Sequence, residues 1–160
     1  MLTTKNVKER PLKVGISNDI GWGCTIRVGQ MMLAHSLLRH VLRDYNILGD
    51  LVNQMSTYTR VLTLMNDNAD GAPGAFSIQN IVRMSLTYDK YPGEWHGPGS
   101  ISHVLKDLNK VYAPRQDFQI VHFSDGMIYY DKIAKAGCQK PRKYLIEMMS
   151  KDVKSEEAAI

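Results

Sequence analysis

Hydrophobic residues recur every three or four positions along several stretches of the chain, which is the spacing of amphipathic α-helices. The strongest pattern runs from Thr25 to about Tyr45 and is apolar around much of its circumference. We therefore expect a central helix there, packed on more than one side. Four further helices are expected to follow capping or opening positions at Asp50 (through Met65), Ser77, Ser100 and Asp131.

The segments between these helices have different patterns. Residues 19–23 place two glycines around a tryptophan, which predicts a turn, and residues 66–75 ("NDNADGAPGA") predict a loop. Phe76 is expected to pack on Ile81 as a hydrophobic staple at the start of the third helix. The stretches "DFQIVHF" and "MIYY", joined by "SDG", predict two short strands late in the chain. The order of elements predicts an α+β fold.

Composition narrows the class of protein. The chain has 160 residues, 44% of them hydrophobic and 22% charged, which is typical of a soluble globular domain. The formal net charge of +4 is modest and spread along the chain, so we expect no nucleic-acid partner. We find no signal peptide and no apolar run near the ~18 residues that span a bilayer, and we expect a cytoplasmic protein. We predict a single domain or the N-terminal part of one, with a lead-in at 1–18 and a basic, poorly ordered tail at 138–160.

Cys24 stands between the glycine turn and the strongest helix, and it has three interpretations. A disulfide with Cys138 is not expected in the cytoplasm. A buried structural thiol is how most free cysteines behave. A nucleophile is the alternative, because a helix N-terminus stabilises a thiolate, and Arg27 could add positive charge one turn further on. The residues alone leave the last two interpretations open.

A cysteine nucleophile in acyl transfer needs a base, usually histidine. His96 follows Glu94 by two positions, but this spacing is a common accident. The other histidines lie on predicted helices or a strand, where none is convincing as a partner of Cys24; they are His35, His40, His103 and His122. No histidine pair has a metal-binding spacing with a cysteine or carboxylate, so we expect no zinc site, and we predict no cofactor.

The stretch "SNDIGWGCTIRVGQMMLAHSLLRH" nevertheless resembles the opening of the autophagin family, autophagy-related cysteine peptidases. The family signature D-x-G-W-G-C, with a basic residue three positions later and then G-Q-M, is present in unbroken order from Asp19 to Met31. "GEWHGPGSISHVLKDL" is similar to the family's G-x-W-[aromatic]-G-P segment, with His96 where an aromatic residue is usual. "QIVHFSDGMIYYDKI" is similar to the strand pair that follows. The resemblance covers residues 15–137.

This resemblance implies a papain-like cysteine peptidase fold, of which the chain holds the N-terminal, catalytic-cysteine half. It implies that Cys24 is the nucleophile at the head of the central helix and that Trp95 helps to hold the substrate's glycine in a narrow channel. The implied reaction is cleavage after the C-terminal glycine of the ubiquitin-like autophagy modifier, which matures the modifier and releases it from phosphatidylethanolamine at membranes.

Two departures from the family bear on activity. The family's base and its orienting carboxylate lie in an Asp-Pro-His motif, and this sequence contains no Asp-x-His. The family also has an oxyanion-stabilising tyrosine in the lead-in, where this chain has Thr4. Two functions therefore stay open: a cysteine peptidase, or a catalytically incomplete paralogue or fragment that binds the modifier without cleaving it.

Overall fold

The computed structural model describes residues 17–42, 51–67, 73–112 and 118–136. The chain divides into two compact units, residues 1–122 and 123–160, and each is described here by itself. In its described part the first unit is helical. Its elements are α2 (Cys24–Val41), α3 (Leu51–Leu64), α4 (Ile78–Ser85), the short 3₁₀ helix η1 (Leu86–Tyr88) and α5 (Pro98–Tyr112).

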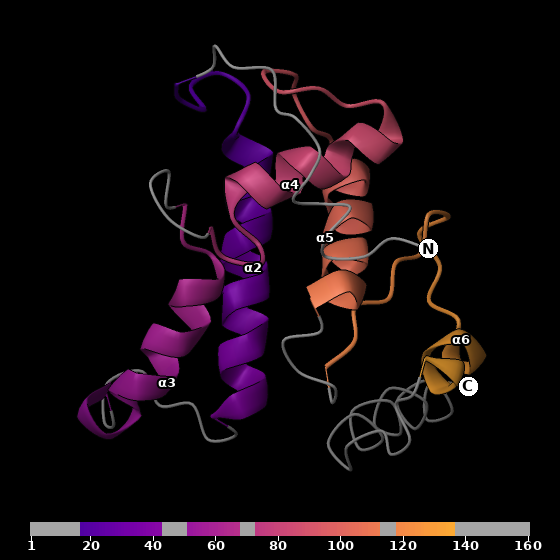
Figure 1. Ribbon diagram of the computed structural model, residues 1–160. Coiled ribbons are helices and arrows are strands. Elements are labelled where there is room, and N and C mark those ends of the chain that lie inside the picture. Colours follow the sequence, from indigo (N-terminus) through magenta and orange to yellow (C-terminus); the bar gives the residue numbers. More distant parts are fainter. Residues whose placement is uncertain (1–16, 43–50, 68–72, 113–117, 137–160) are drawn as a thin grey trace, which may run out of the picture. The chain divides into compact units, whose positions relative to one another are not determined.

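The central helix of the first unit is α2, as its apolar circumference predicted. Helices α3, α4 and α5 all contact it. In Figure 1, α2 and α5 run side by side in the same direction, so that their N-terminal ends lie at the same end of the unit. The buried core gathers apolar side chains from all four α-helices and from the segment just before α4: Ile26, Leu33, Leu37, Leu38, Val61, Phe76, Ile81, Val82, Met84, Ile101, Val104, Leu105 and Leu108.

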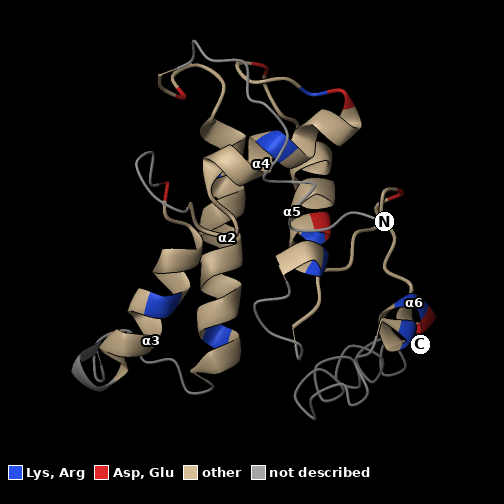
Figure 2. Cartoon of the chain, viewed as in Figure 1, with Lys and Arg blue, Asp and Glu red and all other residues tan. Residues whose placement is uncertain are grey.

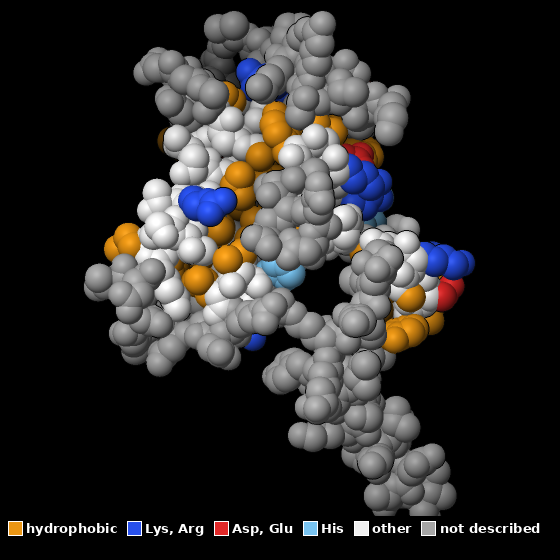
Figure 3. Space-filling model, turned by 60° about the horizontal axis from the view of Figure 1, so that its bottom comes forward, with side chains coloured by type: hydrophobic (Ala, Val, Ile, Leu, Met, Phe, Trp, Pro, Cys, Tyr) orange, Lys and Arg blue, Asp and Glu red, His pale blue; other side chains and the backbone are white. Residues whose placement is uncertain are grey.

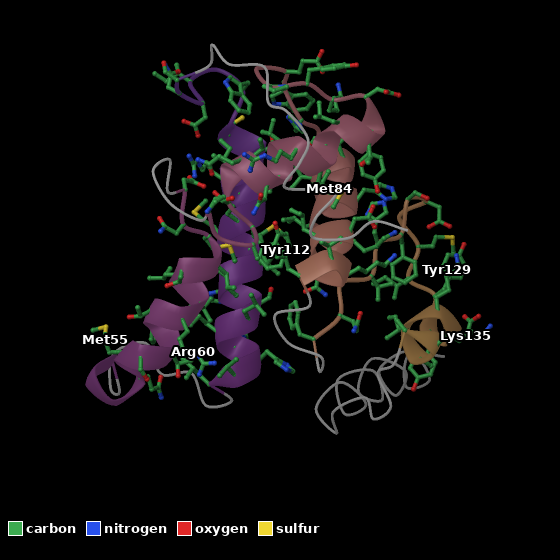
Figure 4. The ribbon with its side chains drawn as sticks, in the orientation of Figure 1. Met55, Arg60, Met84, Tyr112, Tyr129 and Lys135 are labelled. Carbon is green, nitrogen blue, oxygen red and sulfur yellow. The ribbon has the colours of Figure 1, made fainter. Side chains whose placement is uncertain are left out.

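One face of α2 is uncovered although it is apolar. Val28, Met31 and Met32 are 47%, 63% and 67% exposed, and they lie on the same side of the helix as Cys24 because they follow it by four, seven and eight positions. Exposed hydrophobic side chains are visible in the space-filling view of Figure 3 as well. On α3, Met55 is 54% exposed and points away from the other helices in Figure 4.

The start of α4 follows the local signals in the sequence. The backbone N–H of Asn80 donates to Ser77 Oγ at 3.2 Å, which is the predicted side-chain cap. Phe76 and Ile81, the predicted staple pair, are both fully buried. Helix α3 begins at Leu51, directly after the expected capping position 50. The other helices begin one or two residues before the predicted positions; α5, for example, begins at Pro98 rather than Ser100, with proline in the first turn where its missing N–H costs nothing.

The predicted strand pair is wrong for the residues that the structure describes. Residues 118–129 form no strand, and the second predicted strand ends in the helix α6 (Tyr130–Lys135). The two segments belong to different compact units, and two strands without further partners are marginal at best. Phe118 and Ile120 instead pack against the core of the first unit without a ladder of backbone hydrogen bonds.

The second unit is small in its described part. The Asp125 carboxylate accepts hydrogen bonds from the Met127 backbone N–H at 3.2 Å and from the Tyr129 hydroxyl at 2.7 Å. The Lys132 ammonium lies 4.2 Å from the centre of the Tyr129 ring, a cation–π contact. Tyr129 and the helical residue Lys135 are labelled in Figure 4. These contacts join the turn to α6.

Isolated basic residues lie on α2, α3 and α4, and α5 carries basic residues beside an acidic one (Figure 2). No described helix of the first unit carries an uninterrupted run of basic residues. Among the described residues, no helix is long and apolar enough to cross a membrane.

Candidate active site

The predicted turn before Cys24 is present and is held by Asp19. The backbone carbonyl of Asp19 accepts from Trp22 N at 3.3 Å and from Gly23 N at 2.8 Å. Gly21 has a φ of +83°, a left-handed conformation that favours glycine. The indole N–H of Trp22 donates to the carbonyl of Asn18 at 3.2 Å, and the ring packs partly buried against the core. The turn therefore fixes the direction in which the backbone enters α2.

Cys24 is the first residue of α2 and carries a free, exposed thiol. Its Sγ lies 3.8 Å from Thr25 Oγ1. The N-cap residue is Gly23, which has no side chain to satisfy the N–H groups of the first turn. N–H groups at a helix N-terminus and the positive end of the helix dipole are features that attract negative charge. The exposure contradicts a buried structural thiol and agrees with a nucleophile.

The Arg27 side chain binds two carboxylates, those of Asp19 and Asp67. Its Nε donates to Asp19 Oδ2 at 2.8 Å, and one terminal nitrogen pairs with Asp67 and donates to Gln30 Oε1 at 3.0 Å. Burial would lower the pKa of Arg27, but the hydrogen bonds of Asp67 and Asp19 outweigh burial and raise it. The hydrogen bond from Arg27 in turn lowers the pKa of Asp19. The expected positive charge beside Cys24 is thus balanced by two negative ones.

Asp67 is a residue of this network that sequence reasoning missed. Its Oδ1 accepts from Ile78 N, the first backbone N–H of α4, at 2.7 Å, and from Gln30 Nε2 at 3.5 Å. Its carbonyl accepts from Gln79 Nε2 at 3.4 Å. Asp67 lies 40 residues from Arg27 in a predicted loop, where an acidic residue carries no local signal of a partner.

Trp95, the predicted substrate-binding residue, lies in the loop between η1 and α5 and is 57% exposed. A Cβ built on Gly97 would lie 3.6 Å from Cζ3 of the Trp95 ring, so the ring rests beside the glycine. The loop leads into the N-terminal end of α5, which lies at the same end of the unit as the N-terminal end of α2 (Figure 1). The N-terminal ends of the helix that begins at Cys24 and of the helix that follows the Trp95 loop therefore lie at the same end of the unit.

His96 does not form a dyad with the Glu94 carboxylate. Its Nδ1 donates to the backbone carbonyl of Glu94 at 2.8 Å, while Glu94 Oε2 accepts from Tyr91 N at 3.0 Å. The ring is fully buried, and its Nε2 has no hydrogen-bond partner among the described residues. Burial, and then the charge of Lys90, lower the pKa of His96 despite Glu94.

The other four histidines are also not placed as a base for Cys24. His35 and His40 follow Cys24 on α2 by eleven and sixteen residues, which at 1.5 Å per residue is about 16 and 24 Å along the axis. His122 Nδ1 lies 2.7 Å from Ser102 Oγ, and its ring centre lies 3.9 Å from that of His103. Within the described ranges, no group of three histidine, cysteine or acidic residues could hold a metal ion.

Comparison with known proteins gives the family. The model of the peptidase C54 catalytic domain matches residues 3–158. The chain is 34% identical over 128 residues to Cysteine protease ATG4A of Mus musculus, a match that covers 79% of this chain and 31% of the relative. It is 31% identical over 138 residues to Cysteine protease ATG4 of Saccharomyces cerevisiae, covering 83% of this chain and 26% of the relative.

The chain therefore belongs to the peptidase C54 family, and the resemblance to the autophagy-related cysteine peptidases is confirmed. A further match, Cysteine protease ATG4B of Xenopus laevis, is 38% identical over 95 residues and covers 59% of this chain and 23% of that relative. The chain spans about a quarter to a third of the length of these relatives.

Proposed function

We propose that this chain supplies the nucleophile, Cys24, of a cysteine peptidase that cleaves after the C-terminal glycine of the ubiquitin-like autophagy modifier. Such cleavage matures the modifier and releases it from phosphatidylethanolamine. The observation that carries the proposal is an exposed, free thiol at the uncapped N-terminus of α2, within the family's signature turn. Family membership supports the reaction class, and Trp95 is the candidate residue for binding the substrate's C-terminal glycine.

The thiol chemistry fits this role. In acyl transfer the thiolate sulfur attacks the carbonyl carbon of the glycine, a thioester forms, and the leaving amine takes a proton from an acid. Water then hydrolyses the thioester.

This sequence contains no Asp-x-His, and that departure from the family pattern favours a second function, binding of the modifier without cleavage. A thiolate without a positioned imidazole loses orders of magnitude in rate. In this alternative the turn, Cys24 and the loop with Trp95 form a contact surface for the modifier's C-terminus. It predicts binding that survives replacement of Cys24.

A modifier in which a vinyl methyl ester group (–CH=CH–COOCH₃, called the vinyl ester below) replaces the carboxyl of the C-terminal glycine tests the nucleophile without requiring a base. The Cys24 sulfur adds to the β-carbon of the vinyl group, a proton from water adds to the α-carbon, and the adduct has the summed mass of both partners. We expect one adduct, located on Cys24 by peptide mass spectrometry and absent in Cys24→Ala. A ubiquitin vinyl ester and the variant Cys138→Ala serve as matched controls, with no adduct expected from the first and full adduct from the second.

Two outcomes separate the proposals. No adduct on Cys24, or equal labelling by ubiquitin, would contradict the peptidase. A modifier that binds Cys24→Ala in calorimetry, combined with no turnover of a C-terminally extended modifier by the unmodified chain, would favour the binding function.

A further inference from the structure

We propose that Asp67 is a positioning residue for the Cys24 thiol and that it acts through Arg27. The proposal rests on the function proposed for Cys24, since positioning has a purpose only if the thiol reacts. It adds a residue that neither the signature turn nor the family's catalytic motif includes.

The geometry forms a chain of contacts from α4 to the turn. Asp67 pairs with Arg27, and Arg27 Nε donates to Asp19 Oδ2 at 2.8 Å. The backbone carbonyl of Asp19 accepts from Gly23 N at 2.8 Å, and Gly23 directly precedes Cys24. A guanidinium has a rigid, planar set of donors, so holding two of its sides fixes its orientation. Asp67 therefore limits the movement of Asp19, and with it the turn that begins α2.

Asp67 itself is anchored independently of Arg27. Its Oδ1 accepts the backbone N–H of Ile78 at 2.7 Å, at the N-terminal end of α4 where a carboxylate is favoured by the helix dipole. The Asp67 side chain is 24% exposed, and that of Arg27 is 41% exposed. The pair is thus partly shielded from water, which screens it less than a pair on the surface.

The charge of the network argues for positioning rather than for electrostatic activation. One guanidinium faces two carboxylates, Asp19 and Asp67, so the three groups together carry a formal charge of −1. Such a group does not by its charge favour a thiolate. What the network contributes is a fixed start of α2, and with it a fixed position of Cys24 at the end of the helix where the first N–H groups have no intrahelical partner.

The rate of Cys24 alkylation by iodoacetamide tests the proposal on the chain as it exists, without a substrate. A Cys138→Ala background leaves one thiol, whose sulfur displaces iodide from the reagent. Asp67→Asn keeps an oxygen that can accept from Ile78 N and removes the charge paired with Arg27. Loss of one negative charge would by itself speed alkylation, so the rates are compared in 0.5 M KCl, where the Debye length is only about 4 Å.

We expect Asp67→Asn to slow alkylation of Cys24 about two- to five-fold, since that is the range of stabilisation available from a helix N-terminus. In an Arg27→Gln background, Asp67→Asn should have no further effect, because the two residues act in series. Asp107→Asn is the matched control: it removes another carboxylate with a side-chain partner, Tyr88, and should leave the rate unchanged.

Three outcomes overturn the proposal: an unchanged rate in Asp67→Asn, a faster rate, or a slowing that persists undiminished without Arg27. Circular dichroism and thermal unfolding show whether each variant is folded. If Asp67→Asn does not fold, Arg27→Lys takes its place, because lysine keeps the charge and loses the two-sided geometry. It should also slow alkylation, and an unchanged rate would equally overturn the proposal. Failure of the vinyl ester adduct with these rate effects intact would instead refute the proposed function alone.

Discussion

Gly29 of α2 lies directly against Ile101 of α5. A Cβ built on Gly29 would be 2.6 Å from Cγ2 of Ile101 and 3.2 Å from Cδ1 of Leu105. Both side chains are buried, and a β-branched side chain in a helix has one strongly preferred rotamer, so Ile101 cannot swing away. The missing side chain at Gly29 is therefore what allows α2 and α5 to approach, and this approach sets the spacing between the helix that begins at Cys24 and the helix that follows Trp95.

Gly29→Ala should lower the free energy of unfolding by about 1–2 kcal/mol. Overpacking of a buried contact costs about 1–3 kcal/mol, and alanine returns at most about 1 kcal/mol through its better helix propensity. Gly99→Ala in α5 is the matched control, because a Cβ there meets nothing within 4 Å. Urea denaturation of both variants measures the difference. A Gly29→Ala variant as stable as the unmodified chain would show that the two helices separate without cost.

Gln30 is a buried polar residue whose side chain joins α2 to the segment before α4. Its Nε2 donates to the carbonyl of Phe76 at 2.8 Å, and its Oε1 accepts from Arg27 at 3.0 Å. Gln30→Leu leaves the Phe76 carbonyl and the Arg27 guanidinium without the Gln30 amide as a partner. It should lower the free energy of unfolding by about 1–3 kcal/mol.

The control for Gln30 is Ser36→Ala on the exposed face of the same helix. Ser36 Oγ donates only to the carbonyl of Met32 in its own helix, and a surface change of this kind stays within about 0.5 kcal/mol. Thermal unfolding of the two variants compares them directly. Equal midpoints would mean that water replaces the lost hydrogen bonds of Gln30.

The features predicted correctly from the sequence depend on near neighbours in the chain. The periodicity of α2, the turn from Asp19 to Gly23 and the Ser77 cap each involve residues at most a few positions apart, so propensity and spacing suffice to predict them. The exposure of Cys24 did not follow from this pattern, because the residues alone left a buried thiol and a nucleophile both open. The roles of Cys24 and Trp95 in catalysis and binding remain predictions, because a free thiol and an exposed ring identify no substrate.

The features that were missed depend on distant partners. Asp67 meets Arg27 across 40 residues, and nothing in the loop sequence marks it. The stretch from 117 to 123 alternates like a strand, but without a neighbouring strand its alternation serves only to place Phe118 and Ile120 against the helices. The burial of His96 was also missed: its ring is fully buried although it lies in a stretch rich in glycine and proline.

Removing the hydroxyl groups of Tyr112 and Tyr88 should have different effects on the free energy of unfolding. The hydroxyl of Tyr112 (labelled in Figure 4) is buried without a hydrogen-bond partner among the described residues, and burial raises the pKa of Tyr112. Tyr88 donates to Asp107, and burial together with this hydrogen bond raises the pKa of Tyr88 to about 12. Tyr112→Phe should leave stability unchanged or raise it by up to about 1 kcal/mol, and Tyr88→Phe should lower it by less than about 1 kcal/mol. Chemical denaturation checks both signs, and destabilisation by Tyr112→Phe would show a partner for the buried hydroxyl.

Stability should fall in mild acid because His96 is buried in its neutral form. Its pKa is lowered in the folded chain, so below about pH 6.5, the ordinary histidine value, the unfolded chain binds more protons than the folded one. The free energy of unfolding therefore decreases as the pH falls from 7 towards 5. His96→Asn retains an N–H that can donate to the Glu94 carbonyl and does not titrate, so its stability should fall less steeply.

His122 contributes to this acid sensitivity in the same direction. Burial and the neighbouring His103 and Lys106 lower its pKa as well. The double variant His96→Asn/His122→Asn should therefore have a flatter profile than either single variant. Urea unfolding midpoints at pH 5, 6 and 7 give the pH dependence of stability for the unmodified chain and for each variant. A His96→Asn variant with the slope of the unmodified chain would mean that His96 becomes protonated in the folded state without penalty.

Cys24 should react with iodoacetamide faster than Cys138 in the folded chain. Cys24 is exposed at the first position of an 18-residue helix, at the positive end of the helix dipole. Cys138 lies outside the described residues, next to Gly137 in a basic stretch without a strong helix pattern behind it. We expect a rate ratio of about three or more at neutral pH, with the two sites quantified by mass spectrometry of their peptides. In 6 M urea the helix is lost and the two rates should converge; equal rates in the folded chain would remove the contribution of the α2 terminus to the reactivity of Cys24.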